Sequence, residues 1–226
     1  MFILKWGLVI MFVKIANNIS RIPTFYLLLI ILFIGFILRT FSWFYFGTFL
    51  MEDDPHRMGR DGQLYISDYE YYAMNIATRN WDVFESFGGR EHQPVYPLLL
   101  SLRHILDLPQ KAYIFCLHHL LSIGTIYIVY LTAKRIFGVY YGLVSAFFIS
   151  ISAMMIFWFS WVYAETTFHF FLALLGLTAT NLFKDKKPIN YTFFFFSGFL
   201  CMFTRPEGFF PFLIAFLLLI FIHLTQ

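Results

Sequence analysis

The stretch IPTFYLLLIILFIGFILRTFSWFYF, residues 22–46, decides the fold class, because it is long and apolar enough to cross a bilayer as one helix. Arg39 is its only charged residue, and we expect that side chain to extend toward the lipid headgroups. The whole chain of 226 residues is also strongly apolar. It has 60% hydrophobic and 13% charged residues and a mean hydropathy of +0.71. This composition predicts an all-α, polytopic transmembrane protein and excludes an ordinary soluble domain.

Four further apolar runs follow the first, at about residues 111–132, 140–159, 166–183 and 191–224. The last run is interrupted by TRPEG at residues 204–208, where a proline and a glycine accompany two charged residues. Such a sequence breaks a helix and leaves either two shorter segments or a re-entrant bend. We therefore expect about five to six membrane segments in a single transmembrane domain that covers residues 1–226.

Basic residues predict the orientation of these segments, since short loops rich in lysine and arginine stay in the cytoplasm. The clusters are Lys5, Lys14 and Arg21; Lys134 and Arg135; and Lys184, Lys186 and Lys187. Residues 1–21 then form a cytoplasmic lead-in, and residues 47–110 form the first extracytoplasmic loop. The FSWVYAE connection that ends at Glu165 and the TRPEG break fall on the same outer face as that loop. Three polar sites that are far apart in the sequence are therefore expected to converge there.

Short surface helices are expected inside the outer loop. Ser67 and Glu70 have the S-x-x-E spacing of a capping box, which predicts a helix from Asp68 to about Arg79. The prolines of the QPVYP segment start a second helix, from Pro94 to Leu106. The first helix would lie along the membrane surface with two faces: Asp68, Tyr72, Asn75 and Arg79 on one, and Tyr69, Ala73 and Ile76 on the other.

Four motifs in this order resemble the N-terminal part of the GT-C membrane glycosyltransferases. They are DYEYYA at residues 68–73 with QPVYPLLL at 93–100, AKRIFG at 133–138, YAETTF at 163–168 and FTRPEG at 203–208. The nearest likeness is to the branch related to dolichyl-phosphate-mannose protein mannosyltransferases and the lipid A aminoarabinose transferase. Val95 stands where that family usually has glycine, and the family usually carries further spans and often a C-terminal soluble region. The chain therefore resembles an N-terminal portion of such an enzyme.

The resemblance implies a chemistry. Members transfer a sugar, such as the hexose mannose, from a polyprenyl-phosphate donor to an acceptor protein, lipid or glycan on the extracytoplasmic face. They generally use no nucleotide sugar, and we expect no cofactor and no metal. A net charge of +3 on scattered basic residues excludes a nucleic-acid partner. The alternatives are a truncated, non-catalytic remnant or accessory subunit of such an enzyme, and a small transporter, whose polar residues would lie near the midplane instead.

An acidic residue of the outer loop acts as the base in this family, and Asp68 matches its position. The alternative role for Asp68 is to complement the positive end of its own helix dipole. Asp61 is the rival acid, although Asp61-Gly62 is more typical of a turn. Glu52, Asp53, Asp54 and His56 are adjacent polar residues in a loop, and we predict that they are solvated rather than ligands of a metal.

Arg205 is the predicted ligand of the donor phosphate, because guanidinium offers phosphate a planar fork of donors. Its alternative role is an interfacial pair with Glu207. Glu165 is either a charge in the first turn of its helix or a partner for an arginine in the donor site. Arg90 and His92 are lesser candidates for the same pocket. Tyrosines near the interface either stack on a sugar or anchor the loop, and anchoring is our interpretation for Tyr71, Tyr72 and Tyr96.

Overall fold

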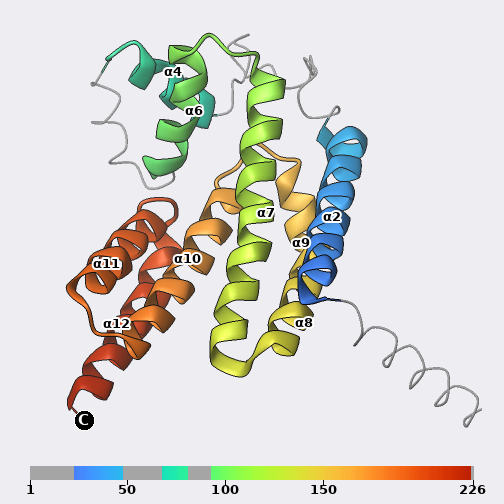
Figure 1. Ribbon diagram of the computed structural model, residues 1–226. Helices are drawn as coiled ribbons and strands as arrows, with labels where there is room; N and C mark the ends of the chain where they lie inside the picture. The colour runs from blue at the N-terminus through green and yellow to red at the C-terminus, as the bar shows by residue number, and fades with distance from the viewer. Residues whose placement is uncertain (1–22, 48–67, 81–92, 225–226) are drawn as a thin grey trace, which may run out of the picture.

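The computed structural model describes residues 23–47, 68–80 and 93–224, and every regular element within these ranges is helical (Figure 1). The α-helices are α2 (Thr24–Ser42), α4 (Asp68–Ala77), α6 (Val95–Ile105), α7 (Gln110–Phe137), α8 (Val139–Ser150), α9 (Ala153–Phe159), α10 (Glu165–Lys184), α11 (Pro188–Met202) and α12 (Phe209–Leu224). A short π-helix, η1 (Trp43–Gly47), extends α2, and a 3-10 turn, η3 (Pro206–Gly208), precedes α12. The predicted all-α class is confirmed for these residues. The predicted lead-in, residues 1–21, and much of the outer loop lie outside them.

Three of the described helices are long and apolar enough to cross a membrane, namely Thr24–Phe46, Gln110–Phe137 and Glu165–Lys184. Helices α8 and α9 would make a fourth span if they count as one, although they bend by 53° at the break between them. At about 1.5 Å per residue, α11 and α12 are shorter than the roughly 30 Å apolar layer of a bilayer. These helices indicate a membrane protein with three to four candidate spans in the described ranges. The five to six membrane segments expected from the sequence stay a prediction.

The TRPEG break folds the last apolar run back on itself. Helices α11 and α12 form an antiparallel hairpin, in which the rings of Phe194 and Phe212 stack 5.6 Å apart. A side chain at Gly198 would place its Cβ 2.2 Å from a Phe212 ring carbon, so glycine is required for the two helices to approach this closely. The predicted break is confirmed, and the choice between two shorter membrane segments and a re-entrant bend stays open.

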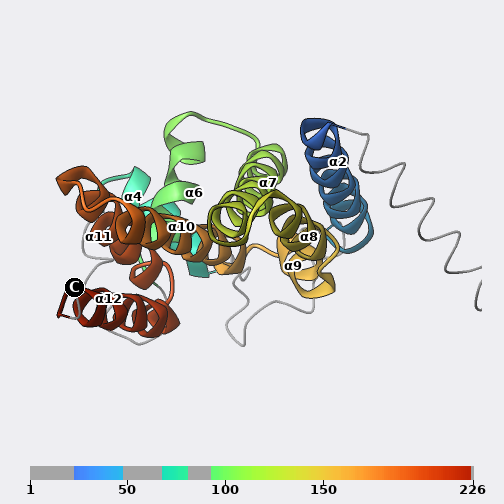
Figure 2. The same ribbon diagram turned by 60° about the horizontal axis from the view of Figure 1, so that its bottom comes forward.

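Helix α7 is the centre of the main bundle (Figures 1 and 2). It ends at Gly138, whose φ of 100° lets the chain turn sharply into α8. Helix α2 covers the α7–α8 pair, and α10 packs on the other side of α7 and leads to the hairpin. The core between α2, α7 and α8 is apolar, with Leu28, Ile31, Ile126, Tyr130, Leu143 and Ala146 buried together.

Arg39 does not extend toward headgroups as its sequence position predicted, because its side chain is completely buried between α2, α7 and α8. The guanidinium donates to Ser122 Oγ and to the carbonyls of Ser150 at 3.0 Å and Ile149 at 3.4 Å. Those two carbonyls end α8, where the chain bends into α9. A helix end inside an apolar layer has no water to satisfy it, so the arginine supplies a donor to Ser150, while the Ile149 carbonyl also accepts from the N–H of Ser152 at 3.4 Å.

Helices α4 and α6 pack against each other as a cap over one end of the bundle (Figure 1). Both begin within one residue of the predicted positions, and Ala73 and Ile76 of the predicted apolar face are buried. The capping box of Ser67 and Glu70 stays a prediction, because Ser67 lies outside the described residues; the Glu70 carboxylate contacts Arg103 of α6. The N–H of Val95 donates to the carbonyl of Phe203 at 3.1 Å, which ties the cap to the hairpin.

The basic ends of α7 and α10 meet at the opposite end of the bundle from the cap (Figure 1). Lys184 Nζ donates to the carbonyl of Arg135, so two of the predicted basic clusters lie together. Helix α2 also starts at this end, as Figure 1 shows. This arrangement is the one that the predicted cytoplasmic side requires, and the assignment of that side to the cytoplasm stays a prediction.

Candidate functional site

An ion pair between α10 and the TRPEG break lies at the centre of the candidate site. Arg205 Nη1 donates to Oε1 of Glu165, and its remaining nitrogens donate to Glu207, with Nη2 at 3.0 Å and Nε at 3.2 Å. The Arg205 side chain is 31% exposed and that of Glu165 is 16% exposed, so the pair is reachable but partly desolvated. Both alternative roles predicted from the sequence occur together: Glu165 is in the first turn of α10 and pairs with an arginine, and Arg205 pairs with Glu207.

The backbone around Arg205 explains why the motif has this sequence. Thr204 ends α11 by donating its hydroxyl to the carbonyl of Leu200 at 2.6 Å, and Pro206 starts the 3-10 turn. Gly208 closes this turn against the end of α11, where an added Cβ would lie 2.4 Å from the carbonyl oxygen of Cys201. Only glycine fits there without moving backbone. The turn therefore holds Arg205 and Glu207 on the side that faces α10.

The start of α4 lies beside this ion pair. The Tyr69 ring is 5.1 Å from that of Tyr96 and 6.3 Å from that of Tyr163, two residues before Glu165. Burial raises the pKa of Tyr69 to about 12; the Glu165 carboxylate adds to this rise, whereas Arg205 opposes it. The residues predicted to converge from the outer loop, from the YAETTF segment and from the FTRPEG segment are thus brought together through Tyr69, Glu165 and Arg205.

Aromatic rings cluster in the connection that leads to Glu165. Trp161 stacks on Tyr163 with centroids 5.9 Å apart, and Trp158 packs edge-on against Tyr163 at 6.0 Å. Tyr163 is 41% exposed. Two buried polar atoms here have no hydrogen-bond partner in the described part of the chain, the Trp161 indole nitrogen and Glu165 Oε2. A buried acceptor and a buried donor next to exposed rings are suited to a ligand with both hydroxyl groups and apolar faces.

Tyr96 supports the site from beneath and does not anchor the loop at an interface, contrary to its prediction. It is completely buried, and its hydroxyl lies 3.0 Å from His118 Nε2. His118 Nδ1 lies 2.8 Å from the carbonyl of Phe159, which only accepts, so Nδ1 carries the proton and Nε2 of the neutral ring accepts from Tyr96. This chain of hydrogen bonds fixes α6 on α7 and α9.

A second ion cluster joins the two cap helices. Glu70 of α4 is buried, and its Oε1 accepts from Arg103 Nε at 2.7 Å and lies 2.9 Å from His104 Nε2. Both partners belong to the last turn of α6. Because Asp68 lies two residues before Glu70, this cluster fixes the helix start at which the predicted base is placed.

The other predicted site residues are placed as follows. Asp68 is the first residue of α4, as predicted. Tyr72, on the same helix, is half-buried and packs edge-on against Tyr71 at 5.8 Å. Asp61, Arg90 and His92 lie outside the described residues, as do the acids predicted to be solvated at 52–54. Within the described ranges, no group of three histidine, cysteine or acidic side chains is arranged to hold a metal ion.

The sequence interpretation missed Tyr69 as a neighbour of the ion pair, and it missed the rings of Trp161 and Tyr163 that lead from Tyr69. Tyr69 was assigned to the apolar face of its helix, and that face turns out to point at the pair. Trp161 and Tyr163 stand within the FSWVYAE connection, where two large aromatic residues next to an acid were the available signal. Comparisons with protein-family models, with curated proteins and with solved structures found no match for this chain.

Proposed function

We propose that this chain is a membrane glycosyltransferase that moves a hexose, such as mannose, from a polyprenyl-phosphate donor to an acceptor on the extracytoplasmic face. The contact between Arg205 and Glu165 beneath the start of α4 is the observation that carries the proposal. It gathers residues of three of the four motifs on which the GT-C resemblance rests. The fourth motif, AKRIFG, belongs to the other end of α7.

Arg205 has donors to offer a phosphate while it keeps its present partners. A guanidinium carries five N–H groups, and the contacts with Glu165 and Glu207 use one on each of its three nitrogens. With the described partners, one N–H remains on each terminal nitrogen, and these groups can donate to oxygens of a phosphate. As the sugar leaves, negative charge grows on that phosphate, and the fixed cation stabilises it.

Two carboxylates around one guanidinium leave this group with a net negative charge, so a phosphate needs a further cation. Arg90 and His92, which precede the QPVYP segment, fill that role in the proposal. Glu207 is also the more exposed of the two acids, with 59% of its side chain accessible against 16% for Glu165. We therefore expect Glu207 to move away from Arg205 when the donor binds, and Glu165 to stay.

Glu165 and Tyr163 offer the sugar ring a hydrogen-bond acceptor and an aromatic face. Glu165 Oε2 is a buried acceptor without a partner among the described residues, and sugar hydroxyls are donors. The polarised C–H face of a pyranose packs well on an electron-rich aromatic face such as that of Tyr163. These two contacts orient the anomeric carbon relative to the phosphate.

Asp68 is the base in this proposal. It takes the proton of the acceptor hydroxyl as that oxygen bonds to the anomeric carbon, while the bond from the carbon to the phosphate oxygen breaks and the polyprenyl phosphate keeps the electron pair. The positive end of the α4 dipole favours the ionised carboxylate, which can accept a proton but is a weaker base for it.

The experiment is a transfer assay with the purified full chain in liposomes and a labelled polyprenyl-phosphate mannose. Asp68→Asn is expected to lower turnover by about 10²- to 10⁴-fold, the usual contribution of a general base. Glu91→Gln, in the same outer loop, is the matched control and is expected to keep turnover. A loss below about tenfold in Asp68→Asn rules Asp68 out as the base. Donor binding without any transfer by the wild type would favour the alternative of an accessory subunit.

A further inference from the structure

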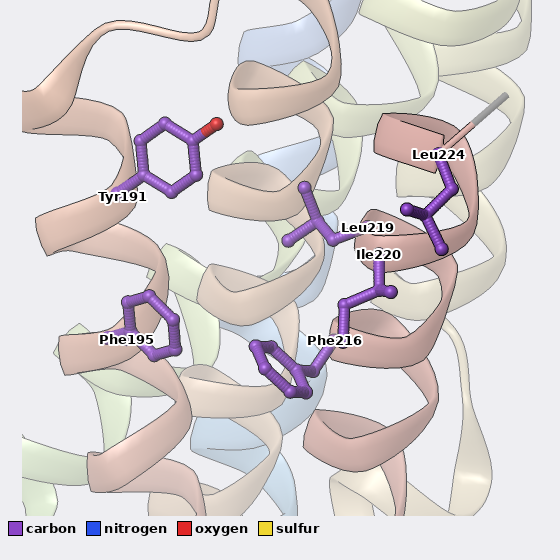
Figure 3. Close-up of a pocket in the computed structure, with 6 residues that line it drawn as sticks. All are labelled: Tyr191, Phe195, Phe216, Leu219, Ile220 and Leu224. Atoms are coloured by element: carbon purple, nitrogen blue, oxygen red, sulfur yellow. The ribbon is translucent and has the colours of Figure 1, made fainter. Parts of the chain in front are cut away.

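A groove of about 230 Å³ runs between the two helices of the hairpin, at the far end of α11 from Arg205 (Figure 3). Figure 3 shows Tyr191 and Leu224 at one end, with Phe195 and Phe216 toward the other. Its walls are almost entirely apolar: Tyr191, Phe195, Phe216, Leu219, Ile220 and Leu224. The walls from Phe216 to Leu224 cover two turns of α12, or about 12 Å.

Cationic residues stand at the Tyr191 end of this groove. Helix α11 begins at Pro188, one turn before Tyr191, and the turn that leads into it is rich in lysine. Because Lys184 reaches the carbonyl of Arg135, the end of α7 joins the same surface. We call this surface the basic patch; it consists of Lys134, Arg135, Lys184, Lys186 and Lys187, with Asp185 as its one acid, 2.7 Å from Lys187.

We propose that the groove and the basic patch together bind one anionic phospholipid, with its phosphate on the patch and an acyl chain between α11 and α12. Five basic side chains against one carboxylate attract an anionic headgroup, and the positive end of the α11 dipole adds to that attraction. The acyl chain needs an apolar channel that starts at the headgroup level, and the groove starts one turn from Lys187. This inference does not depend on the proposed transferase activity.

Native mass spectrometry of the full chain in detergent tests the proposal with phosphatidylglycerol and phosphatidylcholine that have identical acyl chains. The wild type is expected to retain one phosphatidylglycerol under activation that removes phosphatidylcholine. The double variant Lys186→Gln/Lys187→Gln is expected to lower this preference by about tenfold, because each lysine near an anionic headgroup strengthens the electrostatic attraction to it. Lys111→Gln, on a lysine at the start of α7, is the control and should leave the preference unchanged.

The groove is tested by a filling substitution. Ile220→Trp is expected to remove the retained lipid, whereas Ile214→Trp is the matched control, because Ile214 is 59% exposed on α12 and does not line the groove. Equal retention of the two lipids by the wild type, or an unchanged complex in Ile220→Trp, would overturn the proposal. A lipid-free dimer would overturn it as well, by showing that a second copy covers the groove.

Discussion

Two arginines show how differently this fold uses the same side chain. Arg39, at the break between α8 and α9, is completely buried, and every acceptor around it in the described part of the chain is a neutral oxygen. Arg205, at the break between α11 and α12, is partly exposed and faces two carboxylates. Arg39 donates to backbone carbonyls that cannot reach water, so its N–H groups are used within the fold. Among the described residues, Arg205 has N–H groups without an acceptor, and Glu165 Oε2 has no donor, which is what a ligand site requires.

Arg103 lies between these extremes and sharpens the comparison. It is 16% exposed and pairs with Glu70, whose side chain is 6% exposed. Like Arg39, it joins two helices, and like Arg205, it does so through a carboxylate. If burial and partner type decide the role of each arginine, their substitution should lower stability most for Arg39, less for Arg103 and least for Arg205.

The largest effect is expected from Arg39→Leu. The substitution leaves the carbonyls of Ile149 and Ser150 without the guanidinium donors, and an unsatisfied backbone group in an apolar layer costs several kcal/mol. Allowing for relaxation at the bend, we expect the free energy of unfolding to fall by about 3 kcal/mol. Thermal unfolding in detergent measures it, with Arg135→Leu on the exposed end of α7 as the control. A change as small as that of the control would mean that the break does not need Arg39.

The next largest loss of stability is expected from Arg103→Ala. It removes the arginine partner of the buried Glu70 carboxylate, which should lower stability by about 2 kcal/mol. The loss should be local, so hydrogen exchange of the α4 amides is the measurement. A double-mutant cycle with Glu70→Gln isolates the pair, since the two losses are expected to be far from additive. Additive losses would show that Glu70 and Arg103 act separately.

Arg205→Ala should change stability by less than about 1 kcal/mol, because partly exposed pairs contribute little. Its effect is expected on the donor: affinity for a polyprenyl-phosphate sugar should fall by at least about tenfold, the equivalent of one charged hydrogen bond. Equilibrium binding of a fluorescent donor analogue measures this. Lys111→Ala, at the start of α7, is the control for loss of a basic charge elsewhere. Unchanged donor affinity, or a stability loss as large as that of Arg39→Leu, would remove the distinction between the two arginines.

The smallest effect is expected from Tyr69→Phe, and it should depend on pH. The pKa of Tyr69 is raised in the fold to about 12 from 10.0, chiefly by burial, so folding favours the neutral phenol. That stabilisation is complete below pH 10 and is lost as the pH rises toward 12. Melting curves at increasing alkaline pH should therefore fall less steeply for Tyr69→Phe than for the wild type. Parallel curves would show that Tyr69 is not buried beside Glu165.

The sequence predicted the helices better than it predicted their partners. Length and hydropathy located α2, α7 and α10, and the prolines located the start of α6 within one residue. Arg39 was mistaken for a headgroup contact because its acceptors Ser122 and Ser150 lie 83 and 111 residues away in the chain. A local pattern does not contain contacts of that separation.

The candidate site was predicted in part for the same reason. Glu165 and Arg205 stood out because a charge in an apolar run needs a partner. Tyr96 was misplaced, since a tyrosine near an interface is typical of an anchor and only the fold adds α4 above it and His118 below it. The capping pattern around Glu70 is local and does not predict its contact with Arg103, which belongs to a helix that starts 25 residues later.

The hydrogen bond from Val95 to Phe203 also bears on the order of events while the protein is made. The cap helices leave the ribosome well before the hairpin that holds Phe203 and Arg205, because chains grow from the N-terminus. For that interval Glu165 lacks its contact with Arg205, and α6 is held to α7 by the hydrogen bond from Tyr96 to His118 but lacks its tie to the hairpin. The candidate site therefore forms only after the α11–α12 hairpin has been made, and the contact between Glu165 and Arg205 reports that this hairpin has reached its place.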